Sequence, residues 1–215
     1  LVIDSVTGSI NLSSAISGSY DVTYTPPLAQ QLGQDIDGEA AGDESGRSIS
    51  MSRDGLTVAI GAPHNDGNGS NAGHVRVYNY NGTAWTQVGQ DIDGEAAGDE
   101  SGWSVSMSSD GLTLAIGAPY NYGNRFFEEG HVRVYNYNGT AWTQVGQDID
   151  GEAEGDGSGW SVSMSSDGLT VAIGAYFNNG NGSSSGHVRI YSYNGTAWTQ
   201  VGQDIDGEAA GDRSG

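Results

Sequence analysis

Short stretches of the chain alternate between large apolar residues and small polar ones, as β-strands do. Residues 103–108, WSVSMS, place Trp103, Val105 and Met107 on one face and three serines on the other. Residues 112–119, LTLAIGAP, alternate in the same way, and an Asp-Gly pair between the two stretches predicts a tight hairpin. A third stretch covers 131–137, and an Asn-Gly turn leads to a fourth at 141–149. This pattern predicts a four-stranded antiparallel meander.

The same meander recurs along the chain at a fixed period. The acidic segment DIDGEAAGD begins at residues 35, 91 and 204, and DIDGEAEGD begins at 148, so the intervals are 56, 57 and 56 residues. Such a period indicates a repeat architecture. We assign complete repeats to 33–88, 89–145 and 146–201, and a partial fourth to 202–215.

The two faces of the first two strands in each repeat predict how the sheets assemble. In residues 103–108 and 112–119, one face carries Trp, Val, Met, Leu and Ile, the other carries Ser, Thr, Ala and Gly, and neither is charged. Because a free-standing sheet usually solvates one face, both faces are expected to be buried, large against small. We therefore expect an all-β fold of β-propeller blades, with a linear stack of sheets as the alternative.

Three motifs then resemble a known family. SGWSVS, AIGAP and GHVRVY recur at fixed distances and are similar to the FG-GAP repeats of integrin-α-type propellers, in an extracellular variant with DGEAAGDxSG. The resemblance covers 28–215 and implies part of a seven-bladed ring. Arg47 departs from the pattern, because Trp103 and Trp160 stand at that place in the later repeats. The resemblance does not transfer the integrin calcium loop, because its place holds only a tight SxDG turn at 52–55, 108–111 and 165–168.

The first 27 residues lack the repeat. They are expected to form two strands, near 9–12 and 19–25, and resemble the end of an immunoglobulin- or cadherin-like sandwich domain. Residues 28–36 resemble a fourth strand without the three before it. Because propellers have 4–8 blades, three repeats are too few to close a ring. We expect adjacent blades from the same longer chain or from other copies.

Composition restricts the classes of partner. The net charge is −20, and all seven basic residues are arginine, which argues against a nucleic-acid or anionic-membrane partner. No apolar run is long enough to predict a membrane span. Cysteine is absent, which excludes disulfides and thiolate metal sites.

The acidic segments are candidate calcium sites. Carboxylates stand at positions 1, 3, 5 and 9 of each segment, and Ca²⁺ binds six to eight oxygens from such loops. The glycines stand at positions 4 and 8, unlike those of an EF-hand, so solvated turns with capping carboxylates are the alternative. The candidate metal ligands are Asp35, Asp37, Glu39, Asp43, Asp91, Asp93, Glu95, Asp99, Asp148, Asp150, Glu152, Asp156, Asp204, Asp206, Glu208 and Asp212.

Other recurring residues have structural explanations. The histidines and arginines of the GHVR motifs (74–76, 131–133 and 187–189) are expected to make structural hydrogen bonds and ion pairs. Trp85, Trp142 and Trp198 either stack on sugar rings or pack under an adjacent hairpin. The loop between the second and third strands varies most, so Arg125, Phe126 and Phe127 are the candidate partner-binding residues.

Catalysis is not expected, because nearly every reactive residue type recurs in register. We expect a non-enzymatic, secreted or cell-surface module for adhesion, protein recognition or surface architecture. The alternatives are a glycan-binding propeller and a structural repeat of a surface filament.

Overall fold

The computed structural model describes residues 2–3, 10–11, 30–121 and 129–215. The chain divides into two compact units, 1–31 and 32–215. In the first unit, β1 (Val2–Ile3) pairs antiparallel with β2 (Ile10–Asn11). The predicted strand at 19–25 lies outside the described residues, so that prediction stays open.

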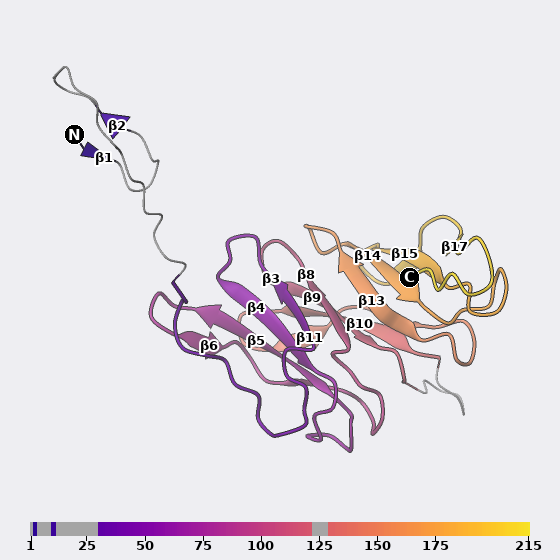
Figure 1. The fold of residues 1–215 in the computed structure, drawn as a ribbon, viewed down its shortest axis with the longest axis horizontal. Helices are drawn as coiled ribbons and strands as arrows, with labels where there is room; N and C mark the ends of the chain where they lie inside the picture. Colours follow the sequence, from indigo (N-terminus) through magenta and orange to yellow (C-terminus); the bar gives the residue numbers. More distant parts are fainter. Residues whose placement is uncertain (1, 4–9, 12–29, 122–128) are drawn as a thin grey trace, which may run out of the picture. The chain divides into compact units, whose positions relative to one another are not determined.

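The second unit contains three antiparallel sheets of one design, shown in Figure 1. Four strands follow one another across each sheet, and a short fifth strand pairs beside the last of them on the third strand. The first sheet comprises β3 (Ser48–Met51), β4 (Thr57–Ala62), β5 (His74–Tyr80), β6 (Trp85–Gln87) and β7 (Ile92–Asp93). The second comprises β8 (Ser104–Met107), β9 (Thr113–Ala118), β10 (His131–Tyr137), β11 (Trp142–Gln144) and β12 (Ile149–Asp150). The third comprises β13 (Ser158–Met164), β14 (Thr170–Ala175), β15 (His187–Tyr193), β16 (Trp198–Gln200) and β17 (Ile205–Asp206).

These sheets confirm the four-stranded meander, with one difference in its last strand. The predicted strand at 141–149 is divided into β11 and β12, which pair with opposite halves of the seven-residue β10. Gly146 stands between them with φ of 75°, a conformation that breaks the extended backbone and that glycine adopts without strain. Residues 30–36, which were expected to resemble a fourth strand, form no strand.

The hairpin between the first two strands of each sheet closes as the sequence predicts. In the first sheet, Asp54 accepts hydrogen bonds from the Ser52 hydroxyl and from the Leu56 amide, at 2.7 and 2.9 Å. Gly55 has φ of 74°. The Ser52 and Leu56 hydrogen bonds hold the pKa of Asp54 below its usual value. The Asp54 carboxylate therefore stabilises the hairpin turn in which it lies.

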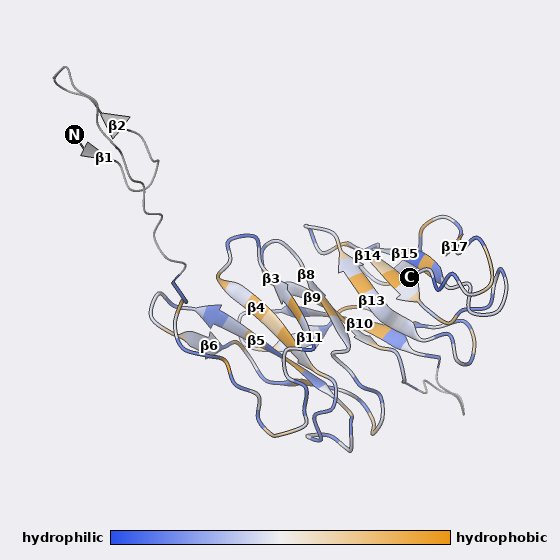
Figure 2. Ribbon diagram, in the orientation of Figure 1, coloured by the Kyte–Doolittle hydropathy of each residue, from blue (hydrophilic) through white to orange (hydrophobic). Residues whose placement is uncertain are grey.

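The large face of one sheet packs on the small face of the sheet before it. Val105 and Met107 of β8 are 9% and 7% exposed, and they share a cluster with Ala59, Val75 and Val77 of the first sheet. A second cluster joins the second and third sheets in the same way. Figure 2 shows apolar residues alternating along these strands. The expectation of a large face buried against a small one is confirmed between neighbouring sheets.

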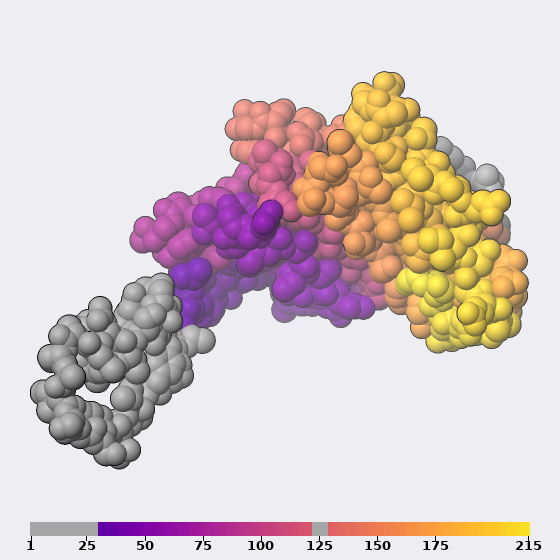
Figure 3. Space-filling view, turned by 90° about the horizontal axis from the view of Figure 1, so that it is seen from above, coloured from indigo at the N-terminus to yellow at the C-terminus, as the bar shows by residue number. Residues whose placement is uncertain are grey.

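Serine hydroxyls hold neighbouring sheets at close range. The Ser48 hydroxyl donates to the Gly102 carbonyl at 2.7 Å, and the Ser50 hydroxyl accepts the Met107 amide at 2.9 Å. Gly61 lies so close to Gly102 that a Cβ atom on it would stand 2.1 Å from the Gly102 oxygen. Three sheets packed in this manner are like the blades of a propeller, and the repeats follow one another in sequence order in Figure 3. In the described residues, no helix is long and apolar enough to cross a membrane.

Candidate functional site

The last carboxylate of each acidic segment accepts hydrogen bonds from amides of its own loop, from an asparagine of the following loop, or from both. Asp99 is 1% exposed, and its Oδ2 accepts the amides of Glu95 and Ala96 at 3.2 and 2.9 Å. Asp156 accepts the Ala153 amide and the Asn178 side chain in the same manner. Asp43 accepts from the Asn65 side chain, and Asp212 accepts the Ala209 amide. Asp99, Asp156 and Asp212 therefore cap their loops, as the alternative of capped turns predicted.

The four carboxylates of one acidic segment do not converge on one point. In the described part of the chain, the clusters of three potential metal ligands combine position 5 of one segment, a histidine, and position 1 of the next segment. The position-3 residues Asp93, Asp150 and Asp206 instead lie in the short strands, opposite these histidines. The three clusters are Glu39, His74 and Asp91; Glu95, His131 and Asp148; and Glu152, His187 and Asp204.

The histidine of each cluster was interpreted as a structural residue, and the structure brings it between two carboxylates. His74 is 4% exposed, and its Nδ1 lies 3.8 Å from Glu39 Oε2 and 4.0 Å from Asp91 Oδ2. Burial and the charge of Arg76 lower the pKa of His74, although Asp91 and Glu39 oppose this. The imidazole is therefore neutral near pH 7 and can serve as a ligand.

The arginine of the GHVR motif pairs with the same carboxylates, as the sequence predicted. Arg76 donates through Nε and Nη2 to the two oxygens of Asp91, at 3.0 and 2.9 Å, and its Nη2 also bonds Glu39. Burial raises the pKa of Asp91, but the hydrogen bonds from Arg76 and Gln87 and the charge of Arg76 outweigh it, so the pKa is lowered overall. Arg189 bonds Glu152 and Asp204 in the third cluster. These repeated acidic and histidine groups can hold ions, with a guanidinium as a competing cation.

The tryptophans of β6, β11 and β16 pack against the preceding repeat. Trp142 and Trp198 are each 3% exposed, and their Nε1 atoms donate to the carbonyls of Val88 and Val145 in the preceding repeat, at 2.8 Å. Trp85 makes the same bond to Leu32. The packing alternative describes Trp142 and Trp198, whose buried indoles join one repeat to the next, whereas Trp85 is only half-buried.

A different group of aromatic residues is partly exposed at the start of β8 and β13 and just after the end of β9 and β14. Trp103 and Trp160 belong to successive repeats, and their ring centroids are 4.9 Å apart. Trp160 stacks on Tyr176 at 5.2 Å and meets Phe177 edge to face at 5.3 Å. Tyr120 contacts both tryptophans. We call these five residues the aromatic row.

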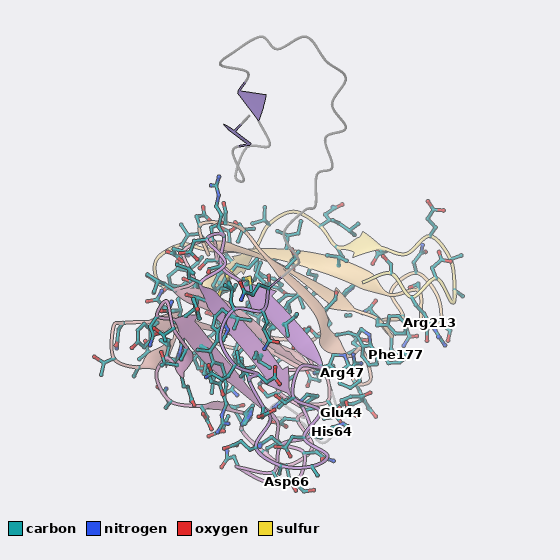
Figure 4. All side chains as sticks on the ribbon, turned by 60° about the vertical axis from the view of Figure 1, so that its left-hand side comes forward. Glu44, Arg47, His64, Asp66, Phe177 and Arg213 are labelled. Atoms are coloured by element: carbon teal, nitrogen blue, oxygen red, sulfur yellow. The ribbon has the colours of Figure 1, made fainter. Side chains whose placement is uncertain are left out.

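An arginine stands at each end of the aromatic row. The Arg47 guanidinium lies 4.3 Å from the centre of the Trp103 ring, and Arg213 lies 5.4 Å from that of Tyr176. Figure 4 shows Arg213, Phe177 and Arg47 along one side of the molecule, continuing to Glu44 and His64. Sequence reasoning placed the tryptophans in the buried face and missed this row. The aromatic residues that recur at the loop ends of the strands in the second and third repeats were the available signal.

The candidate partner-binding residues Arg125, Phe126 and Phe127 lie outside the described residues. Their loop joins β9 to β10. Tyr120 follows β9 at the start of that loop, and Tyr176 and Phe177 follow β14 at the corresponding place in the third repeat. The variable loops therefore begin at the aromatic row.

Comparison with solved structures gives likenesses of fold at low sequence identity. The yeast protein Sqt1 (Saccharomyces cerevisiae) matches with a TM-score of 0.50 and 16% identity over 78% of this chain and 37% of its own. The hydrazine synthase of Kuenenia stuttgartiensis matches with a TM-score of 0.45 and 14% identity over 82% and 42%. The chain thus spans less than half the length of either. A comparison with curated proteins finds no match.

Comparison with protein families finds a match within two of the repeats. The FG-GAP repeat family matches residues 36–78 and 148–191. Both matched segments begin within an acidic segment and end in the third strand of the following sheet, so they contain the SxDG hairpin and the GHVR motif. The resemblance stated from the motifs is therefore confirmed: two of the repeats match the FG-GAP repeat family.

Proposed function

We propose that this chain is a non-enzymatic recognition module of a secreted or cell-surface β-propeller, binding a protein partner through the aromatic row. The observation that carries the proposal is the contact between Trp103 and Trp160 across two repeats, with both rings partly exposed. Tryptophan, tyrosine and arginine are the residue types that contribute most to protein interfaces. The resemblance to extracellular FG-GAP repeats supports the location.

The neighbourhood of the aromatic row favours a partner with apolar and polar groups side by side. Arg47 and Arg213 cover its two ends, and each offers donors beyond its contact with a ring. His64 lies 3.5 Å from Glu44 and 3.8 Å from Glu100, so acidic groups stand beside the row. An extended peptide that combines apolar and basic side chains fits this arrangement.

A glycan is the second candidate, because partly exposed indole rings also stack on sugars. Cells of the source organism, treated with protease or with glycosidases, would be exposed to the fluorescently labelled chain and measured by flow cytometry. We expect binding that protease treatment removes. Loss of binding after glycosidase treatment, but not after protease treatment, would indicate that the partner is a glycan.

Variants connect that binding to the aromatic row. Trp103→Ala and Trp160→Ala are expected to lose most of the binding. Leu56→Ala is the matched control, because Leu56 is 40% exposed and lies in the hairpin between β3 and β4. Unchanged binding by both tryptophan variants would contradict the proposal.

The first sheet exposes the large apolar face that, in the second sheet, packs against the preceding sheet. Ile49 and Met51 of β3 are 69% and 54% exposed, whereas their counterparts in the second sheet, Val105 and Met107, are covered by the first sheet. We propose that this face receives a further blade of the same type and that the complete assembly is a seven-bladed ring. Covering the exposed part of each side chain gains a fraction of the about 1.5–3 kcal/mol that complete burial of such a side chain provides.

Association of the 215-residue chain tests the proposed contact. Sedimentation equilibrium is expected to give a mass at a multiple of 22.2 kDa, and Met51→Lys is expected to return it to a monomer. Leu169→Lys is the control, because Leu169 is exposed in a hairpin. A wild-type monomer at all concentrations would contradict association between copies.

Calcium stabilisation remains a prediction, now with a smaller set of ligands. The carboxylates at positions 1 and 5 that meet in the three clusters are the ones that can reach a common ion. Calcium binds through oxygen and leaves an imidazole unused. The clusters therefore fit calcium less well than an all-carboxylate loop would.

A further inference from the structure

One buried histidine lacks the hydrogen bonds that buried polar groups normally make. His131, the first residue of β10, is 1% exposed, and neither ring nitrogen has a hydrogen-bond partner within the described residues. Buried polar atoms are paired in the great majority of cases, and leaving one unpaired costs about 1–3 kcal/mol. A hydrogen-bonding group or a metal ion at one of the imidazole nitrogens of His131 would remove this cost.

Two carboxylates stand beside this ring at the spacing of metal ligands. One oxygen each of Glu95 and Asp148 and one nitrogen of His131 all lie within 4.8 Å of one another. Ligands about 2.1 Å from a tetrahedral ion are separated by about 3.4 Å. The three side chains need to approach one another by only about 1.4 Å or less, which small rotations about side-chain bonds provide.

The surrounding charges leave a negative excess. Glu95, Asp148 and the buried Asp99 contribute three carboxylates, and the Oδ1 of Asp99 has no hydrogen-bond partner in the part of the chain that is described. Arg133 contributes one positive charge, with Nη1 3.2 Å from Glu95. Burial, followed by the charge of Arg133, lowers the pKa of His131 to about 4 against the opposing effect of Asp148 and Asp99, so the ring is neutral at pH 7. A divalent cation balances the remaining two negative charges.

The middle repeat differs from its two counterparts in how its arginine is used. Arg76 bonds both Glu39 and Asp91 in the first cluster, so a guanidinium already bridges those carboxylates. Arg189 does the same in the third cluster.

Arg133 is turned another way. It contacts Glu95 and donates to the carbonyl of Asp93 at 3.1 Å, and its guanidinium lies 5.6 Å from the Tyr135 ring. Across the described residues it makes no ion pair with Asp148, whose Oδ1 accepts from Gln144 at 2.6 Å. Among the three clusters of the described residues, the space between Glu95 and Asp148 is therefore the one in which no arginine bridges the two carboxylates and an ion can bind.

We propose that Glu95, His131 and Asp148 bind one divalent transition-metal ion of the Zn²⁺ or Co²⁺ type. Such ions accept imidazole nitrogen together with carboxylate oxygen, whereas Ca²⁺ and Mg²⁺ prefer all-oxygen sites. Glu95 lies in the loop that joins β7 to β8, and Asp148 immediately precedes β12. The ion fastens this connecting loop to the outer part of the second sheet. This site is independent of the binding proposed for the aromatic row.

Titration of the chelator-treated chain tests the site. At pH 7, isothermal calorimetry with Zn²⁺ or Co²⁺ is expected to give one ion per chain. Ca²⁺ is expected to bind at least about tenfold more weakly, because it cannot use the imidazole. Bound Co²⁺ is expected to show visible absorption bands of a nitrogen- and oxygen-ligated ion. Ca²⁺ binding as tightly as Zn²⁺, or no binding of either transition metal, would overturn the proposal.

Matched variants place the ion in the middle cluster. Asp148→Asn and Glu95→Gln are expected to weaken Zn²⁺ binding at least about tenfold, and circular dichroism reports whether each variant is folded. Asp204→Asn and Glu39→Gln change the equivalent residues in the other clusters and are expected to retain one ion. His64→Gln removes a histidine beside Glu44 and is also expected to retain it. Loss of the ion in these three controls, or its retention in Asp148→Asn and Glu95→Gln, would refute the assignment.

Discussion

Replacing Gly117 with alanine tests the close approach of neighbouring sheets. A Cβ atom at Gly117 would stand 2.1 Å from the Gly159 oxygen in the next repeat and 2.4 Å from the Ser104 hydroxyl. Ordinary contact begins near 3.4 Å, so the sheets must separate by about 1.3 Å locally. This movement breaks the bond from the Ser104 hydroxyl to the Gly159 carbonyl, now 2.7 Å long.

The expected cost follows from these two effects. Overpacking costs about 1–3 kcal/mol and the lost hydrogen bond about 1 kcal/mol, while alanine restricts the unfolded chain and returns about 0.4–1 kcal/mol. The free energy of unfolding is therefore expected to fall by about 2–3 kcal/mol. For a unit of this size, the melting temperature falls by about 4–12 °C.

Thermal unfolding followed by circular dichroism measures the change. Gly174→Ala is the matched control, because Gly174 occupies the same place in β14 but its close backbone neighbour is Gly215, the last residue of the chain. A Cβ atom at Gly174 would also stand 2.4 Å from the Ser161 hydroxyl, as one at Gly117 would from Ser104, so the two variants share that contact. The control is expected to lose less stability than Gly117→Ala, because moving Gly215 does not separate two sheets. A Gly117→Ala variant as stable as the wild type, or a control that is equally destabilised, would refute the close-packing argument.

Three further predictions concern the tryptophans, the buried histidine and bound ions. Trp198→Ala is expected to lower the free energy of urea unfolding by about 3–5 kcal/mol, because the ring is buried and its Nε1 bonds Val145, whereas the partly exposed Trp103 is expected to cost clearly less when replaced. Because the pKa of His131 is lowered to about 4, the unfolded chain binds more protons between pH 6.5 and 4, so stability falls by up to about 3 kcal/mol as the pH decreases across that range. His131→Gln is expected to flatten this dependence in urea titrations, and an unchanged slope would contradict the assignment. Chelation by EDTA is expected to lower the melting temperature, and a melting curve indifferent to EDTA and to added Ca²⁺ or Zn²⁺ would exclude structural ions.

Residue alternation predicted the local structure well, for a physical reason. In WSVSMS and LTLAIGAP, every second side chain must point to the same side of an extended backbone, so the two faces of β8 and β9 can be derived from the sequence alone. The Asp-Gly and Asn-Gly pairs fix the hairpins between them. The division of the fourth strand was missed, because Gly146 was not recognised as a point where the backbone leaves the extended region.

The candidate site was predicted only in part. The acidic segments were recognised as places where carboxylates gather, but their members were grouped within a segment. Glu95 and Asp148 belong to different segments and meet because β12 pairs beside the start of β10, where His131 stands. Neither spacing nor composition carries the information that this pairing supplies.

The sequence by itself determined the repeat length, the strand faces, the hairpins and the family, because each depends on residues close together in the chain or on their recurrence. Tertiary structure alone decided which carboxylates meet a histidine, which arginine bridges them, and which tryptophans are buried. Those outcomes depend on how one sheet rests on the next, where a Gly–Gly contact or a serine hydrogen bond sets the distance. Hydrogen bonds from the Ser104 and Trp142 side chains to backbone carbonyls 55 and 54 residues away form only once that stacking is complete.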